Sequence, residues 1–304
     1  MIKILLIFLI NLQSKFDNRD SSPKRHPSEE NKINVQCKAN AVQRWMFRGK
    51  KDGIAHPPEG YELQKEYDLT TLDLDDWDLG PSWGDYHPEL LNAYYDRTGE
   101  TIETDSGGVM KIGVKRKPKT FVTKDDRQIN IPYVRGRLHS KLKFRYGWFE
   151  AKIKQPEGKN LWTAFWLTGA HSWPPEIDIF EAYTDEGKNY KEGIWKNTKI
   201  KPNLHYGYLD KGTKEAYGTR SIPTWGMTKR FVHYACLWEE DRIEIYYDGQ
   251  LAFRCTDPEI LEYFNSGHNW MTLIVSNNLT PSAWDADEEP MEVKDLKVYK
   301  LKKQ

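Results

Sequence analysis

The sequence LWTAFWLTGAHSWPPEIDIFE, residues 161–181, decides the fold that we predict for this chain. Residues 161–168 are apolar at odd and even positions alike, which is typical of a central strand buried on both faces. Residues 176–181 alternate acidic and large apolar side chains, which is the two-residue period of a strand with one face in a core. The stretch therefore predicts two β-strands, the second with a row of carboxylates on the face away from the core.

The spacing of the three acids predicts a β-bulge within the second strand. Glu176 and Asp178 share one face of a regular strand, but Glu181 lies at an odd offset and would point into the core. Burying that unpaired carboxylate would cost several kcal/mol, and exposing Phe180 would lose about 2 kcal/mol more. One inserted residue at positions 179–180 removes both costs, because it turns Glu181 outward and Phe180 inward.

Short alternating runs separated by Gly, Pro and Asp extend outward from this stretch through most of the chain. We expect further strands at residues 108–115, 146–154, 231–238, 242–247, 251–255 and 293–301. Asp248 and Gly249 are a typical hairpin turn between two of them. No segment keeps a helical period over ten or more residues. Many short strands with regular turns predict an all-β sandwich or barrel.

The composition excludes some functions and leaves others open. The 304 residues carry 45 Lys and Arg against 45 Asp and Glu, so the formal net charge is zero. A generic basic footprint for nucleic acid and a polybasic membrane patch are therefore excluded. The 12 Trp and 17 Tyr outweigh the 11 Phe, and such rings with polar edges suit surfaces that stack on sugars or nucleobases.

The N-terminal segment predicts export. Residues 1–15 contain Lys3 and a short apolar run, which resembles a secretory signal peptide and is too short to span a bilayer. A misassigned start or a frayed terminus is the competing interpretation. Residues 16–45 are polar and predict a flexible linker, so one folded domain is expected over residues 46–304. We therefore expect a secreted protein, extracellular or periplasmic.

The three cysteines predict neither a disulfide framework nor a zinc site. Cys37 lies in the linker, whereas Cys236 and Cys255 fall on the first and third strands of a predicted meander. Those strands would lie about 9–10 Å apart, which exceeds the reach of a disulfide. We expect both of these thiols to be free.

Three carboxylates along one strand face repel one another, and a structural protein gains nothing from that. A glycosidase needs such a group, since one carboxylate attacks the sugar while another, with its pKa raised by neighbouring charge, donates a proton. A solvated acidic strand edge is the competing interpretation. Nearby Trp162, Trp166 and Trp173 favour a sugar-binding cleft. We expect Trp166 and Trp173 to line it and Trp162 to lie in the core.

Several blocks of the sequence resemble glycoside hydrolase family 16 and follow the order found in that family. They are residues 133–140 (YVRGRLHS), 144–154 (FRYGWFEAKIK), 161–169, 173–181, 204–207 (LHYG), 238–250 (WEEDRIEIYYDGQ) and 292–299 (EVKDLKVY). The resemblance implies a jelly-roll β-sandwich of two curved antiparallel sheets with a concave substrate cleft. It also implies endo-acting, retaining hydrolysis of internal β-linkages in a polysaccharide, either a β-galactan such as agarose, porphyran or carrageenan or a β-1,3-glucan.

The same resemblance implies roles for single residues. It gives Glu176 as the nucleophile, Glu181 as the acid/base and Asp178 as the assisting carboxylate. The residues that it implies for substrate binding are Trp166, Trp173, His205 and Trp284. A strand histidine with no part in catalysis is the competing interpretation of His205.

Three departures from the family's pattern favour a galactan over a plain β-1,3-glucan. Thr163 stands where many members have Pro, and Pro175 stands where laminarinases often have Gly. The late Gly-Gly-x-Trp element of many laminarinases is replaced by a different sequence ending at Trp284.

No cofactor is expected, because the sequence contains no P-loop, dinucleotide fingerprint, zincin motif or nucleophile elbow. No metal is expected at the catalytic carboxylates. An acidic cluster could hold a structural calcium ion, with a solvated acidic turn as the competing interpretation. Its members are Asp68, Asp73, Asp75, Asp76 and Asp78.

The expected partner is the polysaccharide substrate, bound by a monomer, with neither nucleic acid nor a membrane span. The basic residues 115–119 (KRKPK) could contact sulfate groups on a polysaccharide, with a solvated charge run as the competing interpretation. Two alternative functions stay open on the same fold. One is a transglycosylase, and the other is a non-catalytic carbohydrate-binding protein.

Overall fold

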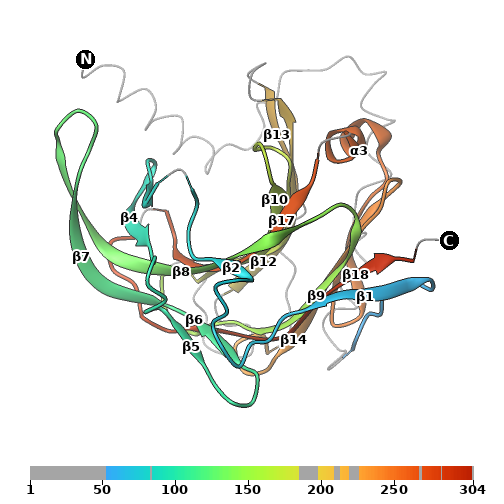
Figure 1. Ribbon diagram of the computed structural model, residues 1–304, viewed down its shortest axis with the longest axis horizontal. Helices are drawn as coiled ribbons and strands as arrows, with labels where there is room; N and C mark the ends of the chain where they lie inside the picture. Colours follow the sequence, from blue (N-terminus) through green and yellow to red (C-terminus); the bar gives the residue numbers. More distant parts are fainter. Residues whose placement is uncertain are drawn as a thin grey trace. The chain divides into compact units, whose positions relative to one another are not determined.

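The computed structural model describes residues 53–82, 84–184, 198–208, 213–218, 226–266, 269–281 and 283–302. Within these residues the chain forms two β-sheets and one short helix (Figure 1). The predicted signal peptide at residues 1–15, the predicted linker at 16–45 and Cys37 lie outside them. Among the residues described, no helix has the length and apolar content that a bilayer crossing requires.

One sheet has eight strands, all paired antiparallel. They are β1 (Tyr61–Glu66), β5 (Ile102–Thr104), β6 (Met110–Ile112), β9 (Gly147–Lys154), β14 (Val232–Trp238), β15 (Ile243–Tyr247), β16 (Gln250–Cys255) and β18 (Met291–Leu301). Their order is β16-β15-β14-β9-β18-β6-β5, with β1 also paired to β18. The meander β14-β15-β16 is confirmed, and Cys236 and Cys255 on its outer strands are buried and form no disulfide in the described structure, as expected.

The other sheet has ten strands. They are β2 (Trp77–Asp78), β3 (Tyr86–His87), β4 (Leu90–Tyr95), β7 (Val114–Val122), β8 (Gln128–Phe144), β10 (Leu161–Gly169), β11 (Glu176–Thr184), β12 (Thr198–Tyr208), β13 (Thr213–Gly218) and β17 (Met271–Leu279). Their order is β13-β12-β11-β10-β17-β8-β4-β3, with β2 and β7 also paired to β8. The pairing of β4 with β8 is parallel, so the expectation of purely antiparallel sheets needs that correction.

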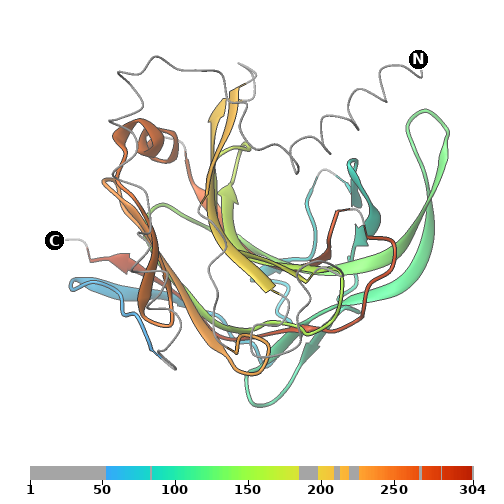
Figure 2. The ribbon, with the colours of Figure 1, turned by 180° about the vertical axis from the view of Figure 1, so that it is seen from behind.

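The ten-stranded sheet is curved. The β7–β8 hairpin at one end and β12–β13 at the other rise toward the same side of the sheet in both views (Figure 1 and Figure 2). The eight-stranded sheet lies against the opposite side (Figure 2). One face of the ten-stranded sheet is therefore concave and the other faces the core.

The hydrophobic core lies between the two sheets. Phe149 and Ile153 of β9 enter it from one side, and Phe165 and Leu167 of β10 enter it from the other. All four side chains have no exposed surface, and burying each contributes about 1.5–3 kcal/mol. The predicted sandwich and the predicted central strand at residues 161–168 are confirmed.

The β-bulge in β11 is confirmed at the predicted position. Phe165 of β10 pairs with Phe180 and Trp166 pairs with Asp178, so Ile179 is the extra residue. Ile179 and Phe180 are both fully buried in the core. The hydroxyl of Tyr247 on β15 donates a hydrogen bond to the Ile179 carbonyl at 2.8 Å. A side chain of the opposite sheet thus satisfies the backbone oxygen of the extra residue.

Two local predictions were incomplete. The single strand expected at residues 108–115 is divided at Gly113, whose N–H donates to the Thr101 carbonyl at 2.8 Å, into β6 and the long β7. A helix, α3 (Pro258–Asn265), was also missed. Asp257 caps its N-terminus, and Ile260, Leu261 and Phe264 are its buried residues. The helix has only eight residues, so its period is too short to show over ten.

Candidate active site

Three carboxylates lie on the concave side of β11. Ile177 and Ile179 take the core side, and Glu176, Asp178 and Glu181 take the other. Asp178 is 3 % exposed and Glu181 is 8 % exposed, so these acids are held among other side chains rather than in bulk water. The bulge gives all three a common face, which confirms the geometric part of the prediction.

Both oxygens of the Glu176 carboxylate contact neighbouring side chains. The indole N–H of Trp173 donates to Oε2 at 2.9 Å. On the neighbouring strand β12, His205 stands opposite Glu176, and its Nε2 lies 3.3 Å from Oε1. The same nitrogen lies 3.4 Å from Oδ2 of Asp178 and 3.0 Å from the Asn203 amide. The structure therefore brings Trp173 and His205 together with the two acids, as predicted.

Donor atoms of Glu176, Asp178 and His205 lie within 4.8 Å of one another. Within the described ranges this is the grouping that has a spacing suited to a metal ion. The contacts of His205 with both acids account for the close spacing without an ion.

Burial makes protonation of Glu176 and Asp178 favourable. Burial, followed by the charge of Asp178, raises the pKa of Glu176 to about 8. Burial and the charge of Glu181 raise the pKa of Asp178 well above its ordinary value. Asp178 is the more deeply buried of the two, so we expect it to be the acid that keeps its proton. With Asp178 neutral, His205 and the Trp173 N–H stabilise the ionised form of Glu176, which a nucleophile requires.

Glu181 has its own hydrogen-bond partner, which the sequence reasoning missed. The hydroxyl of Tyr183 donates to Oε1 of Glu181 at 2.8 Å. The Tyr183 ring is stacked on Trp162, with centroids 5.4 Å apart and planes inclined by 16°. Trp162 is half-buried on the concave side, so the expectation that it lies in the core was wrong. Its even offset from Trp166 already placed both rings on one strand face.

Trp166 lies farther along the concave face, toward β8. It is half-buried, and its indole nitrogen is 3.4 Å from the Ser276 hydroxyl on β17. The guanidinium of Arg137 lies 5.4 Å from the Trp166 ring, and those of Arg137 and Arg135 lie 5.7 and 4.1 Å from the Tyr95 ring. The sequence reasoning missed Arg135, Arg137 and Tyr95 as site residues. The even spacing of the two arginines in YVRGRLHS was the available signal.

Trp284 is one of the exposed large side chains of the described structure. It belongs to the loop between β17 and β18, and 60 % of its surface is exposed. In the described part of the chain no hydrogen bond or ring contact joins it to the three acids. Its role in substrate binding stays a prediction.

The acidic cluster at residues 68–78 is engaged in local turns. Asp68 accepts hydrogen bonds from the N–H and hydroxyl of Thr70, and Asp73 accepts one from the N–H of Asp75. Asp76 forms an ion pair with Lys65 at 2.6 Å. These contacts favour the solvated acidic turn over a calcium site.

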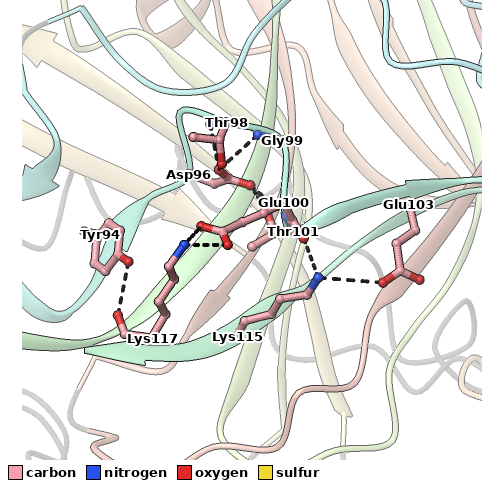
Figure 3. Close-up of polar contacts among 9 residues, drawn as sticks. All are labelled: Tyr94, Asp96, Thr98, Gly99, Glu100, Thr101, Glu103, Lys115 and Lys117. Atoms are coloured by element: carbon pink, nitrogen blue, oxygen red, sulfur yellow. Dashed lines mark hydrogen bonds and ion pairs between the residues drawn. The ribbon is translucent and has the colours of Figure 1, made fainter. Parts of the chain in front are cut away.

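Two of the four cations in the basic run at residues 115–119 contact acidic neighbours (Figure 3). The ammonium of Lys117 contacts both carboxylate oxygens of Glu100 at 2.8 and 2.7 Å. Lys115 lies 3.8 Å from Glu103 (Figure 3). The carboxylate of Asp96, beside them, accepts hydrogen bonds from Thr98 and Thr101. This arrangement favours a surface ion-pair network over a sulfate-binding patch.

A β-sandwich whose concave face carries three adjacent carboxylates beside indole rings has the site of a polysaccharide-cleaving glycosidase. Comparison with known proteins agrees, since the model of the family described as "Glycosyl hydrolases family 16" matches residues 93–298. The chain belongs to this family of glycosidases.

Relatives of known activity and solved structures extend the comparison. Endo-1,3-1,4-beta-glycanase EglC of Rhizobium meliloti (strain 1021) is 31 % identical over 209 residues, which cover 68 % of this chain and 39 % of that protein. The chain spans 29 to 39 % of the length of the first three curated relatives.

Two solved structures show the same jelly-roll fold. LamAcat from Zobellia galactanivorans has a TM-score of 0.63 at 18 % identity, covering 78 % of this chain and 97 % of that one. The kappa-carrageenase from Pseudoalteromonas carrageenovora, solved with an oligotetrasaccharide of kappa-carrageenan, has a TM-score of 0.58 at 19 % identity. The match covers 83 % of this chain and 99 % of the carrageenase.

Proposed function

We propose that this protein is an endo-acting, retaining glycoside hydrolase that cleaves internal β-linkages of a polysaccharide. The observation that carries the proposal is the bulged strand β11, which turns Glu176, Asp178 and Glu181 to one face. Two neighbouring carboxylates that flank the scissile glycosidic bond are what a double displacement uses. The concave sheet face admits a polymer from the side, which suits attack within a chain.

The first displacement uses Glu176 and Glu181 together. The Glu176 carboxylate attacks the anomeric carbon, and the bond from that carbon to the glycosidic oxygen breaks. Glu181 gives its proton to the departing oxygen. Tyr183, through its hydrogen bond to Oε1, holds the Glu181 carboxyl in place for this transfer.

The second displacement restores the enzyme. A water molecule gives a proton to Glu181 while its oxygen attacks the anomeric carbon, and the bond to Glu176 breaks. Asp178 keeps its own proton throughout and assists by orienting Glu176 and limiting the negative charge beside it. His205 and Trp173 hold the Glu176 carboxylate on the same two oxygens that they contact in the resting structure.

The polymer that we propose is a β-galactan or a β-1,3-glucan. EglC is named as a 1,3-1,4-β-glycanase, a further relative from Niallia circulans as a glucan endo-1,3-beta-glucosidase, and one structural neighbour as a kappa-carrageenase. These named activities support a β-linked polysaccharide as the substrate.

The proposal is tested by anomer-resolved hydrolysis. The purified protein is incubated with laminarin, lichenan, agarose, porphyran and κ-carrageenan, and the first products are followed by ¹H NMR. Retention predicts that the β-anomer of the new reducing end appears first and then mutarotates. An α-anomer appearing first, or activity of Glu176→Gln or Glu181→Gln equal to wild type, would overturn the mechanism. Glu66→Gln, on β1 of the other sheet, is the control and should keep full activity.

A further inference from the structure

Glu176, Asp178 and His205 are spaced like the ligands of a metal ion. Nε2 of His205 lies 3.3 Å from Oε1 of Glu176 and 3.4 Å from Oδ2 of Asp178. We infer that these three side chains form an inhibitory site for a divalent transition-metal ion, with zinc as the ion that their geometry fits. The inhibition rests on the proposed function, because the ion occupies the proposed nucleophile, whereas the binding itself does not depend on any activity.

The two distances from His205 match the edge of a zinc coordination tetrahedron. Zinc lies about 2.0–2.2 Å from an imidazole nitrogen or a carboxylate oxygen, so two ligand atoms of a tetrahedral site are about 3.3–3.6 Å apart. The three donor atoms all lie within 4.8 Å of one another. A rotation of Glu176, which is more exposed than Asp178, is enough to bring the two oxygens to the same separation.

The kinds of donor atom select the class of ion. One imidazole nitrogen with two carboxylate oxygens suits zinc and the neighbouring transition metals. Calcium takes about six to eight oxygen ligands, and magnesium requires an octahedron of oxygens. Three protein ligands leave a fourth position of the zinc tetrahedron for water. The site therefore fits zinc better than either hard cation.

An independent observation at Asp178 also points to a ligand. Its Oδ2 is buried and has no hydrogen-bond partner among the described residues. The side chain is 4 % exposed, so solvent does not satisfy this oxygen. Burying a polar atom without a partner is unfavourable, and coordination to a metal is one way in which proteins compensate for it. A bound ion takes the place of the proton that we expect on this acid.

The surroundings give the ion a route of entry and hold its ligands. The side chains of Glu176 and His205 are 14 % and 17 % exposed, so a hydrated ion reaches them from solvent. The Trp173 N–H binds Oε2 of Glu176 at 2.9 Å, while Oε1 of that carboxylate faces His205. Such outer contacts orient metal ligands. The Asn203 amide lies 3.0 Å from Nε2 of His205, and the ion must displace that contact.

A bound ion stops the proposed reaction for two reasons. Coordination occupies the Glu176 oxygen whose lone pairs attack the anomeric carbon. The ion also places two positive charges beside a sugar whose transition state is itself positively charged. The steps proposed above use the protein side chains alone, so this ion is an inhibitor rather than a cofactor.

Calorimetric titration of the chelator-treated, full-length protein with zinc chloride measures binding without reference to activity. Glu176→Gln, Asp178→Asn and His205→Gln should each weaken this binding by more than about 100-fold, since loss of an outer contact alone costs about 10- to 100-fold. Zinc bound elsewhere contributes equally to wild type and variants. Magnesium chloride should not compete.

The matched control is His233→Gln. Nε2 of His233 lies 3.3 Å from Oε2 of Glu150 on the other sheet, the same spacing as in the proposed site. No third donor joins this pair to form a metal-binding group in the part of the chain that the structure describes. The His233→Gln variant should therefore bind zinc with the affinity of wild type.

Crystals of the wild-type protein soaked in zinc chloride locate the ion even if a variant fails to fold. An anomalous peak about 2.0–2.2 Å from Nε2, Oε1 and Oδ2 supports the site. The absence of a peak there, or equal zinc affinity in wild type and all three variants, would overturn it.

Inhibition is measured separately, so that the two proposals can fail independently. Zinc should inhibit hydrolysis at the concentrations at which it binds, and EDTA should restore the activity. Full hydrolysis at saturating zinc would overturn the inhibitory role. Zinc binding that depends on the three residues, in a protein that hydrolyses no polymer, would support the metal site and count against the proposed function alone.

Discussion

Replacing Glu176 by glutamine is expected to abolish hydrolysis and to stabilise the fold, increasingly so at higher pH. In the folded protein, burial and the neighbouring Asp178 raise the pKa of Glu176 from its ordinary 4.5 to about 8. The folded state therefore holds a proton that the unfolded state has lost between about pH 4.5 and pH 8. Wild-type stability must fall as the pH rises through that window. The glutamine side chain does not titrate, so the stability of the variant should not decrease in this way as the pH rises.

The magnitude follows from the size of the pKa change. One pKa unit corresponds to about 1.4 kcal/mol, so a group that titrated alone would lose on the order of 5 kcal/mol across the window. Part of the rise in the pKa of Glu176 comes from the charge of Asp178, and that part disappears when Asp178 is neutral, so the gain for a single substitution is smaller. We expect Glu176→Gln to be more stable than wild type by about 2 kcal/mol at pH 8, with little difference at pH 5.

The assay is urea unfolding followed by tryptophan fluorescence at pH 5 and pH 8. Glu150→Gln on β9 of the other sheet is the matched control. Burial alone would raise the pKa of Glu150, but hydrogen bonds from His233 and Trp148 lower it overall. Its stabilising contribution is thus present above about pH 4.5 and is lost below, so this variant should be less stable than wild type at both pH values. A Glu176→Gln protein no more stable than wild type at pH 8, or equally stabilised at both pH values, would refute the reasoning.

Three further predictions concern the geometry of β11. Deleting Ile179 removes the bulge and should turn Glu181 toward the core. We expect the hydrolytic activity to fall by more than about a thousandfold and the melting temperature to drop. Activity within tenfold of wild type would contradict the role of the bulge. Phe180→Ala should lower the free energy of unfolding by about 3–5 kcal/mol in urea titrations, because the ring is fully buried; a loss below about 1 kcal/mol would mean that the site collapses around the cavity. Tyr183→Phe removes the hydroxyl that donates a hydrogen bond to Glu181. We expect kcat to fall about tenfold, with KM nearly unchanged and an altered pH profile of kcat. A change in KM alone would indicate that Tyr183 contacts the substrate instead.

The sequence predicted the catalytic strand well because two strong constraints acted on a short segment. The two-residue period of a strand and the cost of burying Glu181 together require a bulge at residues 179–180. The pairing of Trp166 with Asp178 shows that bulge. The same two-residue period was enough to predict the strands of the meander β14-β15-β16 and strand β9. In each case the information needed lay within ten residues.

The misses have identifiable physical causes. The two-residue period of a strand also places the two arginines of β8 on one face, and Trp162 and Trp166 of β10 on one face. The prediction for Trp162 was wrong because it gave more weight to the general burial of tryptophan than to this period. Helix α3 was signalled by Asp257 before Pro258, a cap followed by a residue suited to a first helical turn.

Other features depend on contacts distant in sequence. The placement of His205 opposite Glu176 and the parallel pairing of β4 with β8 follow from sheet register, which no local pattern specifies. The hydrogen bond from Tyr247 to the bulge likewise joins residues 68 positions apart. Such features require the assembled sandwich before they can be assigned.

That hydrogen bond between sheets has a mechanical consequence. Since the Tyr247 hydroxyl on one layer anchors the Ile179 carbonyl in the other, the acids cannot shift along their strand without altering the separation of the two layers. The reactive geometry is thus tied to the integrity of the whole sandwich rather than to a hinged loop. Heat inactivation and global melting of this domain should then coincide, and a partly loosened but still competent form should never accumulate.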